Sequence, residues 1–143
     1  SYLILTFVSF FLLLFAMGIN VRLSIVGALA FGLCAYNFQI LQVGHNSKMV
    51  AIALMPMVLA GVVYAYRKKA FLGAVLFGFA LSFEIAANHP QITFYLGMII
   101  LAYVIAQLVS AIKNKTLPAF IKTSLLYNSF EYFLILSNPS AMI

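Results

Sequence analysis

The sequence predicts an all-α protein: a polytopic transmembrane helix bundle with about six membrane-spanning helices. Of its 143 residues, 66% are hydrophobic and only 7% are charged, whereas soluble domains carry roughly 25% charged residues. Its apolar runs approach the roughly 20 residues that a helix needs to cross about 30 Å of hydrocarbon. Because a helix satisfies its own backbone hydrogen bonds in lipid, such runs are expected to be helical.

Short polar connectors separate the apolar runs. The predicted spans are residues 2–19, 23–43, 49–66, 70–87, 92–112 and 119–136. We expect residues 1–143 to form a single transmembrane region. The chain begins with Ser1, has no basic leader before its first apolar run and ends at Ile143. These features favour an internal fragment of a longer membrane protein.

The basic residues occur in alternate connectors, which indicates an orientation. Consecutive spans reverse direction, so alternate connectors share a side of the membrane. Lys48 is the one basic residue on the first side, and seven lie on the other: Arg22, Arg67, Lys68, Lys69, Lys113, Lys115 and Lys122. Positively charged residues stay in the cytoplasm. The Arg67-Lys68-Lys69 connector is therefore predicted to be cytoplasmic, with His45 and His89 extracytoplasmic.

The net charge of +6 has the same explanation. Retention of Lys and Arg in cytoplasmic connectors makes a basic balance ordinary in a membrane protein. We therefore expect membrane lipid as a partner and no nucleic acid.

The first polar cluster is the run Gly44-His45-Asn46-Ser47-Lys48. At helical spacing, Gln39, Gln42 and His45 share one face, which favours the wall of a cavity. The alternative is a polar helix end from which Lys48 reaches the membrane surface.

The second polar cluster contains Glu84 and the connector Asn88-His89-Pro90-Gln91. Glu84 and Asn88 are one helical turn apart, and Pro90 is expected to end the helix. An ionisable residue within a membrane is a functional candidate. Glu84 fits three roles: a general base, a cation ligand, or the partner of Lys48 or His89.

Other candidate residues carry weaker signals. Cys34 is the only cysteine and is expected in helix packing. His45, His89 and Glu84 suit zinc chemically, but they lack a local ligand spacing, so no metal site is assigned. Glu131 interrupts the last span, where it either faces a cavity or marks an irregular helix.

Three runs of the sequence resemble the YfhO-type bacterial membrane proteins, particularly their Bacteroidetes members. These runs are residues 44–49 (GHNSKM), 66–69 (YRKK) and 88–95 (NHPQITFY). The resemblance covers about residues 1–123, and Ser137-Asn138-Pro139 resembles a later landmark of the family.

The resemblance implies a GT-C-like glycosyltransferase of the bacterial inner (cytoplasmic) membrane, which transfers sugar from a polyprenyl-phosphate donor at the extracytoplasmic face. Glu84 would be a supporting acid. The implied donor-phosphate residues are His45, Asn46, Lys48, Asn88, His89 and Gln91. The catalytic residues remain unknown, because the family's acidic loop would lie upstream of Ser1 and this chain contains no Asp. A divalent metal cofactor stays open.

Two other functions remain compatible with the sequence. A transporter or flippase for a lipid-linked or polar solute could use the same polar cluster as a vestibule. A structural or assembly subunit would lack a connected polar cavity. Transporter sites usually lie near the bilayer midplane, whereas these polar residues lie near one interface, which favours the enzyme.

Overall fold

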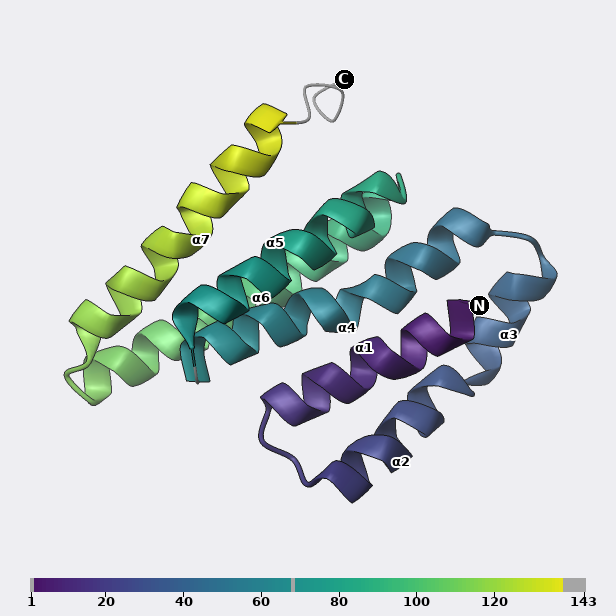
Figure 1. Cartoon of the computed structure of the whole chain (residues 1–143), viewed down its shortest axis with the longest axis horizontal. Helices are drawn as coiled ribbons and strands as arrows, with labels where there is room; N and C mark the ends of the chain where they lie inside the picture. The colour runs from purple at the N-terminus through teal and green to yellow at the C-terminus, as the bar shows by residue number, and fades with distance from the viewer. Residues whose placement is uncertain (1, 68, 138–143) are drawn as a thin grey trace.

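The computed structural model describes residues 2–67 and 69–137, and every regular element in these ranges is an α-helix (Figure 1). The side chains of residues 127, 128 and 130–137 lie outside this description. The described helices are α1 (Tyr2–Ala16), α2 (Val21–Gly32), α3 (Ala35–Gln42), α4 (Asn46–Arg67), α5 (Ala70–Ala86), α6 (Pro90–Lys113) and α7 (Leu117–Ser137). The predicted all-α fold is confirmed.

The helix lengths support fewer spans than the six predicted. Within the described residues, α4 and α6, with 22 and 24 residues, are long and apolar enough to cross a membrane. The pair α2 and α3 also passes if it counts as one bent span, which gives up to three. α1 and α5 have 15 and 17 residues. They extend only about 22–26 Å at 1.5 Å per residue, which is less than about 30 Å of hydrocarbon.

The predicted span at residues 23–43 is not one continuous helix. α2 ends at Gly32 and α3 begins at Ala35, with a bend of 40° between them. The side-chain amide of the buried Asn37 donates to the carbonyls of Phe31 (2.9 Å) and Gly32 (3.3 Å). Carbonyls at the end of a helix lack partners within the helix, and the Asn37 side chain adds a donor there, although the Phe31 carbonyl also accepts from the backbone amide of Cys34 (3.4 Å). Cys34, expected in helix packing, is instead exposed at the break.

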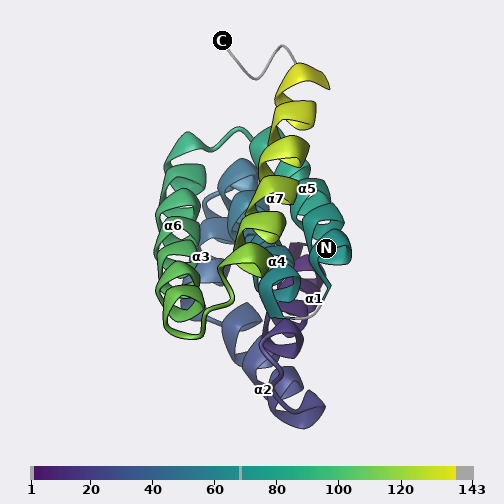
Figure 2. The same cartoon turned by 90° about the vertical axis from the view of Figure 1, so that its left-hand side faces the viewer.

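α4 occupies the middle of the bundle (Figure 1; Figure 2). Twelve of its residues are buried, and its most extensive contacts are with α5 and α1. α2 packs against α1, while α6 and α7 complete the bundle beside α4 and α5. The largest buried cluster joins α4, α5 and α6 through Met57, Val58, Val62, Phe77, Ala80, Leu81 and Leu96. α4 is therefore the element on which the neighbouring helices are assembled.

Two glycines bring the backbones of α4 and α5 into direct contact. A Cβ added to Gly61 would lie 2.5 Å from the backbone nitrogen of Phe77, and one added to Gly73 would meet the backbone of Ala65. Because the opposing atoms belong to the backbone, they move only if a whole helix moves. Small residues permit this kind of close approach between membrane helices.

Replacement of Gly61 by Leu is therefore expected to separate α4 from α5. Overpacking of this kind typically costs about 1–3 kcal/mol, so the midpoint of thermal unfolding of the detergent-purified protein should fall. Gly97→Ala is the matched control, because a Cβ at Gly97 meets no atom within 4 Å. Equal midpoints for wild type, G61L and G97A would contradict the close contact.

Candidate functional site

The connectors gather at the two ends of the bundle because successive long helices run in opposite directions (Figure 1). The connectors after α1, α4 and α6 lie at one end, and those after α3 and α5 lie at the other. The first end carries most of the basic residues of the described helices and connectors: Arg22, Arg67, Lys69, Lys113 and Lys115. The second end carries both histidines and Lys48. The fold thus separates two chemically different ends.

The connector between α3 and α4 begins where a glycine ends α3. Gly44 has φ +77°, a conformation that favours glycine after a helix. The backbone amide of His45 then donates to the carbonyl of Ile40 (3.3 Å). The predicted stripe of three polar residues is therefore interrupted: Gln39 and Gln42 belong to α3, whereas His45 lies beyond its end.

The polar residues of this connector face solvent or a neighbouring ring. His45 and Asn46 are exposed, and Lys48 is half-buried. The Lys48 Nζ lies 5.5 Å from the centre of the Tyr36 ring, within range of a cation–π interaction. Lys48 is therefore held over α3 while the connector remains accessible.

The connector between α5 and α6 changes direction at Asn88 rather than at Pro90. Asn88 has φ +53°, and its backbone amide donates to the carbonyl of Ile85 (2.9 Å). Asn tolerates this left-handed conformation better than most residues. Pro90 occupies the first turn of α6, where a missing amide hydrogen costs nothing. The expectation that Pro90 ends the preceding helix is wrong: Pro90 starts the next one.

Glu84 forms the main polar link between α5 and α6. Its side chain is fully buried, at 0% exposed, and the Thr93 Oγ1 lies 3.0 Å from each carboxylate oxygen. The same hydroxyl lies 3.4 Å from the His89 carbonyl. Of the three roles predicted for Glu84, the partner role is filled by Thr93 instead of Lys48 or His89.

Thr93 is the residue that sequence reasoning missed, although its signal was present. Glu84 lies near the end of α5, and Thr93 lies a similar distance after the start of α6. A short connector places such residues opposite each other in an antiparallel helix pair. The neighbouring His89 is half-buried, and its Nδ1 is a buried atom with no hydrogen-bond partner.

The sequence-predicted donor residues thus form two groups at the same end of the bundle. Asn88, His89 and Gln91 surround one connector, and Gln91 donates to the hydroxyl of Tyr95 (3.3 Å). His45, Asn46 and Lys48 surround the other connector. Among the described residues, no hydrogen bond or ring contact joins the two groups, so a shared site stays a prediction.

Potential metal ligands are scattered among the described residues. They include no group of three His, Cys, Asp or Glu side chains that could hold an ion. Glu131 falls among the side chains that are not described, although α7 runs through residues 128–132 without a break. Ser137 is the last residue of α7, and Asn138 and Pro139 lie outside the described residues.

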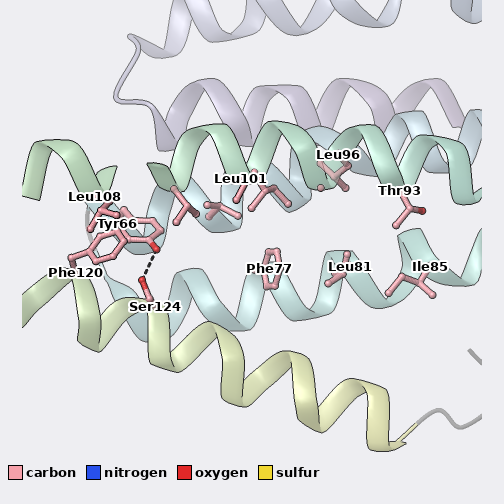
Figure 3. Close-up of a pocket in the computed structure, with 14 residues that line it drawn as sticks. Tyr66, Phe77, Leu81, Ile85, Thr93, Leu96, Leu101, Leu108, Phe120 and Ser124 are labelled. Atoms are coloured by element: carbon pink, nitrogen blue, oxygen red, sulfur yellow. Dashed lines mark hydrogen bonds between the residues drawn. The ribbon is translucent and has the colours of Figure 1, made fainter. Parts of the chain in front are cut away.

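A groove of about 710 Å³ lies between α5 and α6, with α4 behind it and α7 at one end (Figure 3). Thr93 lies at the end nearest the α5–α6 connector. At the opposite end, the hydroxyls of Tyr66 and Ser124 are hydrogen-bonded at 2.8 Å. The apolar residues between these ends are Val62, Phe77, Leu81, Ile85, Leu96, Ile100, Leu101, Val104, Leu108 and Phe120. No motif in the sequence predicts this groove.

Comparisons with protein-family models, curated proteins and solved structures give no match to this chain. The resemblance to YfhO-type proteins therefore remains an expectation that these comparisons do not test.

The link between Glu84 and Thr93 yields a prediction for stability. Thr93→Val keeps the shape of the side chain but leaves the buried Glu84 without its donor, which should cost about 1–3 kcal/mol. The measurement is the thermal unfolding midpoint in detergent. Thr123→Val is the control, because the Thr123 hydroxyl donates to the Ala119 carbonyl of its own helix (3.0 Å).

A double replacement separates loss of the hydrogen bond from simple loss of packing. When both partners become apolar, no buried polar group remains unsatisfied, so Thr93→Val combined with Glu84→Leu should recover part of the lost stability. If the two replacements destabilise additively, Thr93 and Glu84 do not act as a pair.

Proposed function

We propose that this chain is a multi-pass region of a GT-C-like membrane glycosyltransferase, which helps to bind a polyprenyl-phosphate sugar donor at the extracytoplasmic face. The observation that carries the proposal is the chemical difference between the two ends of the bundle. The end formed by the connectors after α3 and α5 combines histidines, amides and Lys48. Such side chains can donate several hydrogen bonds to a phosphate.

The proposed topology has six passes: α1, the bent pair α2 and α3, α4, α5, α6 and α7. A short apolar helix can span where the bilayer thins or where flanking side chains extend to the interface. The end that carries Arg67 and Lys69 is assigned to the cytoplasm of a bacterial inner membrane. His45 and His89 then lie extracytoplasmically, where a lipid-linked sugar presents its headgroup.

In the proposed mechanism, donor binding and leaving-group stabilisation are the tasks of this region. Lys48 and the histidines would donate charge-assisted hydrogen bonds to the phosphate as it departs from the sugar. Asn46, Asn88 and Gln91 would orient its remaining oxygens. Glu84 is fully buried and bonded to Thr93, which suits it to support the α5–α6 connector. We assign the catalytic base to an acidic residue elsewhere in a longer protein.

A transporter is the second candidate, and the broken pair α2 and α3 is the observation that favours it. Transporters often form their substrate sites at broken helices, where unwound carbonyls coordinate ions. Here the Asn37 amide donates to the carbonyls of Phe31 and Gly32. The Asn37 side chain therefore already occupies two carbonyls at the break, and the glycosyltransferase remains the better-supported proposal.

The topology can be tested with single cysteines in a Cys34→Ser background of the full-length protein. Cysteines at positions 48 and 89 should react with a membrane-impermeant maleimide in intact cells. Cysteines at 69 and 115 should react only after the cells are permeabilised. The reverse pattern would exclude the proposed orientation.

The donor-binding role can be tested by Lys48→Ala and His89→Ala in the full-length protein. Each change should lower sugar transfer by about 10²-fold if the side chain stabilises the departing phosphate, with membrane abundance unchanged. Transfer is measured in vesicles with a polyprenyl-phosphate sugar and a lipid acceptor fraction. Lys113→Ala, at the opposite end of the bundle, is the matched control and should transfer sugar at the wild-type rate.

Two results would contradict this assignment. Equal transfer by wild type and both variants would remove Lys48 and His89 from the mechanism. Solute flux that depends on these residues, without any transfer of sugar, would support the transporter instead.

A further inference from the structure

We infer that the groove between α5 and α6 binds one acyl chain of a membrane phospholipid, with the phospholipid headgroup at the α5–α6 connector. The headgroup end of this site shares the α5–α6 connector with the donor-phosphate residues Asn88 and Gln91 proposed above, whereas binding of the acyl chain in the groove does not depend on glycosyl transfer. The inference rests on the size of the groove, the chemistry of its walls and the difference between its two ends.

The length of the groove suits an extended hydrocarbon chain. Its lining on α6 runs from Thr93 to Leu108, a rise of about 22 Å at 1.5 Å per residue. The cavity volume over this length is about 710 Å³, so the space is long and narrow, as an extended acyl chain requires.

The walls of the groove favour hydrocarbon over water. Between its two polar ends the described lining is aliphatic or aromatic apart from Gly97, and it includes no charged side chain. Water enters a cavity when it finds two to four polar partners there. At the far end, the hydroxyls of Tyr66 and Ser124 are bonded to each other. An apolar chain therefore loses no hydrogen bonds when it enters.

The groove also opens toward the surroundings of the bundle. Leu101, which is 60% exposed, and the exposed Gly97 lie in its lining on α6. In a bilayer, a lipid chain can therefore enter from the side between α5 and α6. Burial of each methylene group in such a groove favours binding.

The two ends of the groove give the lipid a direction. Phe120 and Ser124 of α7 line the end near Tyr66, and the Tyr66 ring stacks on Phe120 with centroids 5.6 Å apart. Asn88 and Gln91 are exposed beside the Thr93 end, and their polar side chains favour the phospholipid headgroup there. The tail of the acyl chain then lies toward the Tyr66 end, between the aromatic rings.

Photocrosslinking of the full-length protein tests the site. The probe is a phosphatidylglycerol with a diazirine in the middle of one acyl chain, diluted into phosphatidylethanolamine and phosphatidylglycerol vesicles. Labels mapped by mass spectrometry should concentrate on the groove residues Leu81 and Ile100. Ile99 is the internal control, because it is 45% exposed on α6 and does not line the groove.

Gly97→Leu provides the blocking variant. Gly97 lines the groove, and a Cβ there meets no atom within 4 Å, so the new side chain should fill the groove without a backbone clash. Loss of about two buried methylene contacts should lower labelling of Leu81 and Ile100 about tenfold. Met98→Leu, at a position that is 56% exposed outside the groove, should leave the labelling unchanged.

Three outcomes would overturn the inference. Wild-type labelling of Leu81 and Ile100 no stronger than labelling of Ile99 would show only lipid around the protein. Labelling unaffected by a folded G97L variant would place the chain elsewhere. Preferential displacement of the phospholipid probe by a polyisoprenyl phosphate would identify a different occupant. The first comparison needs only wild-type protein, so the test does not depend on folding of the variant.

Discussion

The direct backbone contact between α4 and α5 is the constraint on which the rest of the bundle depends. Gly61 and Gly73 have no side chains at the crossing, so each helix lies against the main chain of the other. α4 can then bury its opposite face against α1, where the Ser9 hydroxyl donates to the Ala53 carbonyl. The helices α1, α4 and α5 therefore pack together without needing contacts from α6 or α7. Interlocked backbones of this kind resist sliding, because packed interiors have little free volume.

The position of α5 in turn determines the geometry at the second polar connector. α5 is held along α4, whereas α6 makes few contacts with α5. The space left between them is the apolar groove. The hydrogen bond from Thr93 to Glu84 joins α6 to α5 at the end of the groove nearest the α5–α6 connector. Glu84 therefore has a structural role as a hydrogen-bond partner, which is one of the three kinds of role that the sequence left open. The residues proposed to bind phosphate, Asn88, His89 and Gln91, lie on the adjacent connector. Their phosphate-binding roles remain proposals.

The sequence predicted the helices well because hydrophobic run length and polar punctuation are local signals. The connectors after α3, α4, α5 and α6 all fall where polar residues interrupt apolar runs. The break before Ala35 was missed because neither a proline nor a charged residue interrupts residues 23–43. The side chain of Asn37 reveals the break only through its bonds to the carbonyls of Phe31 and Gly32. Thr93 was overlooked for a similar reason. Its partner is nine positions away and becomes adjacent only once the two helices turn back on each other.

The sparse packing of α6 gives the bundle two tiers of local stability. In this helix only Leu96 and Ala111 are buried, whereas α4 buries twelve residues. Regions with few buried apolar contacts open at lower free energy than the core, and their amide hydrogens exchange with solvent sooner. α1, α4 and α5 therefore form one cooperative unit. α6 is attached to that unit through the buried Leu96, the partly buried Ile100 and Tyr103, and the carboxylate of Glu84, so it is expected to open before the centre unfolds.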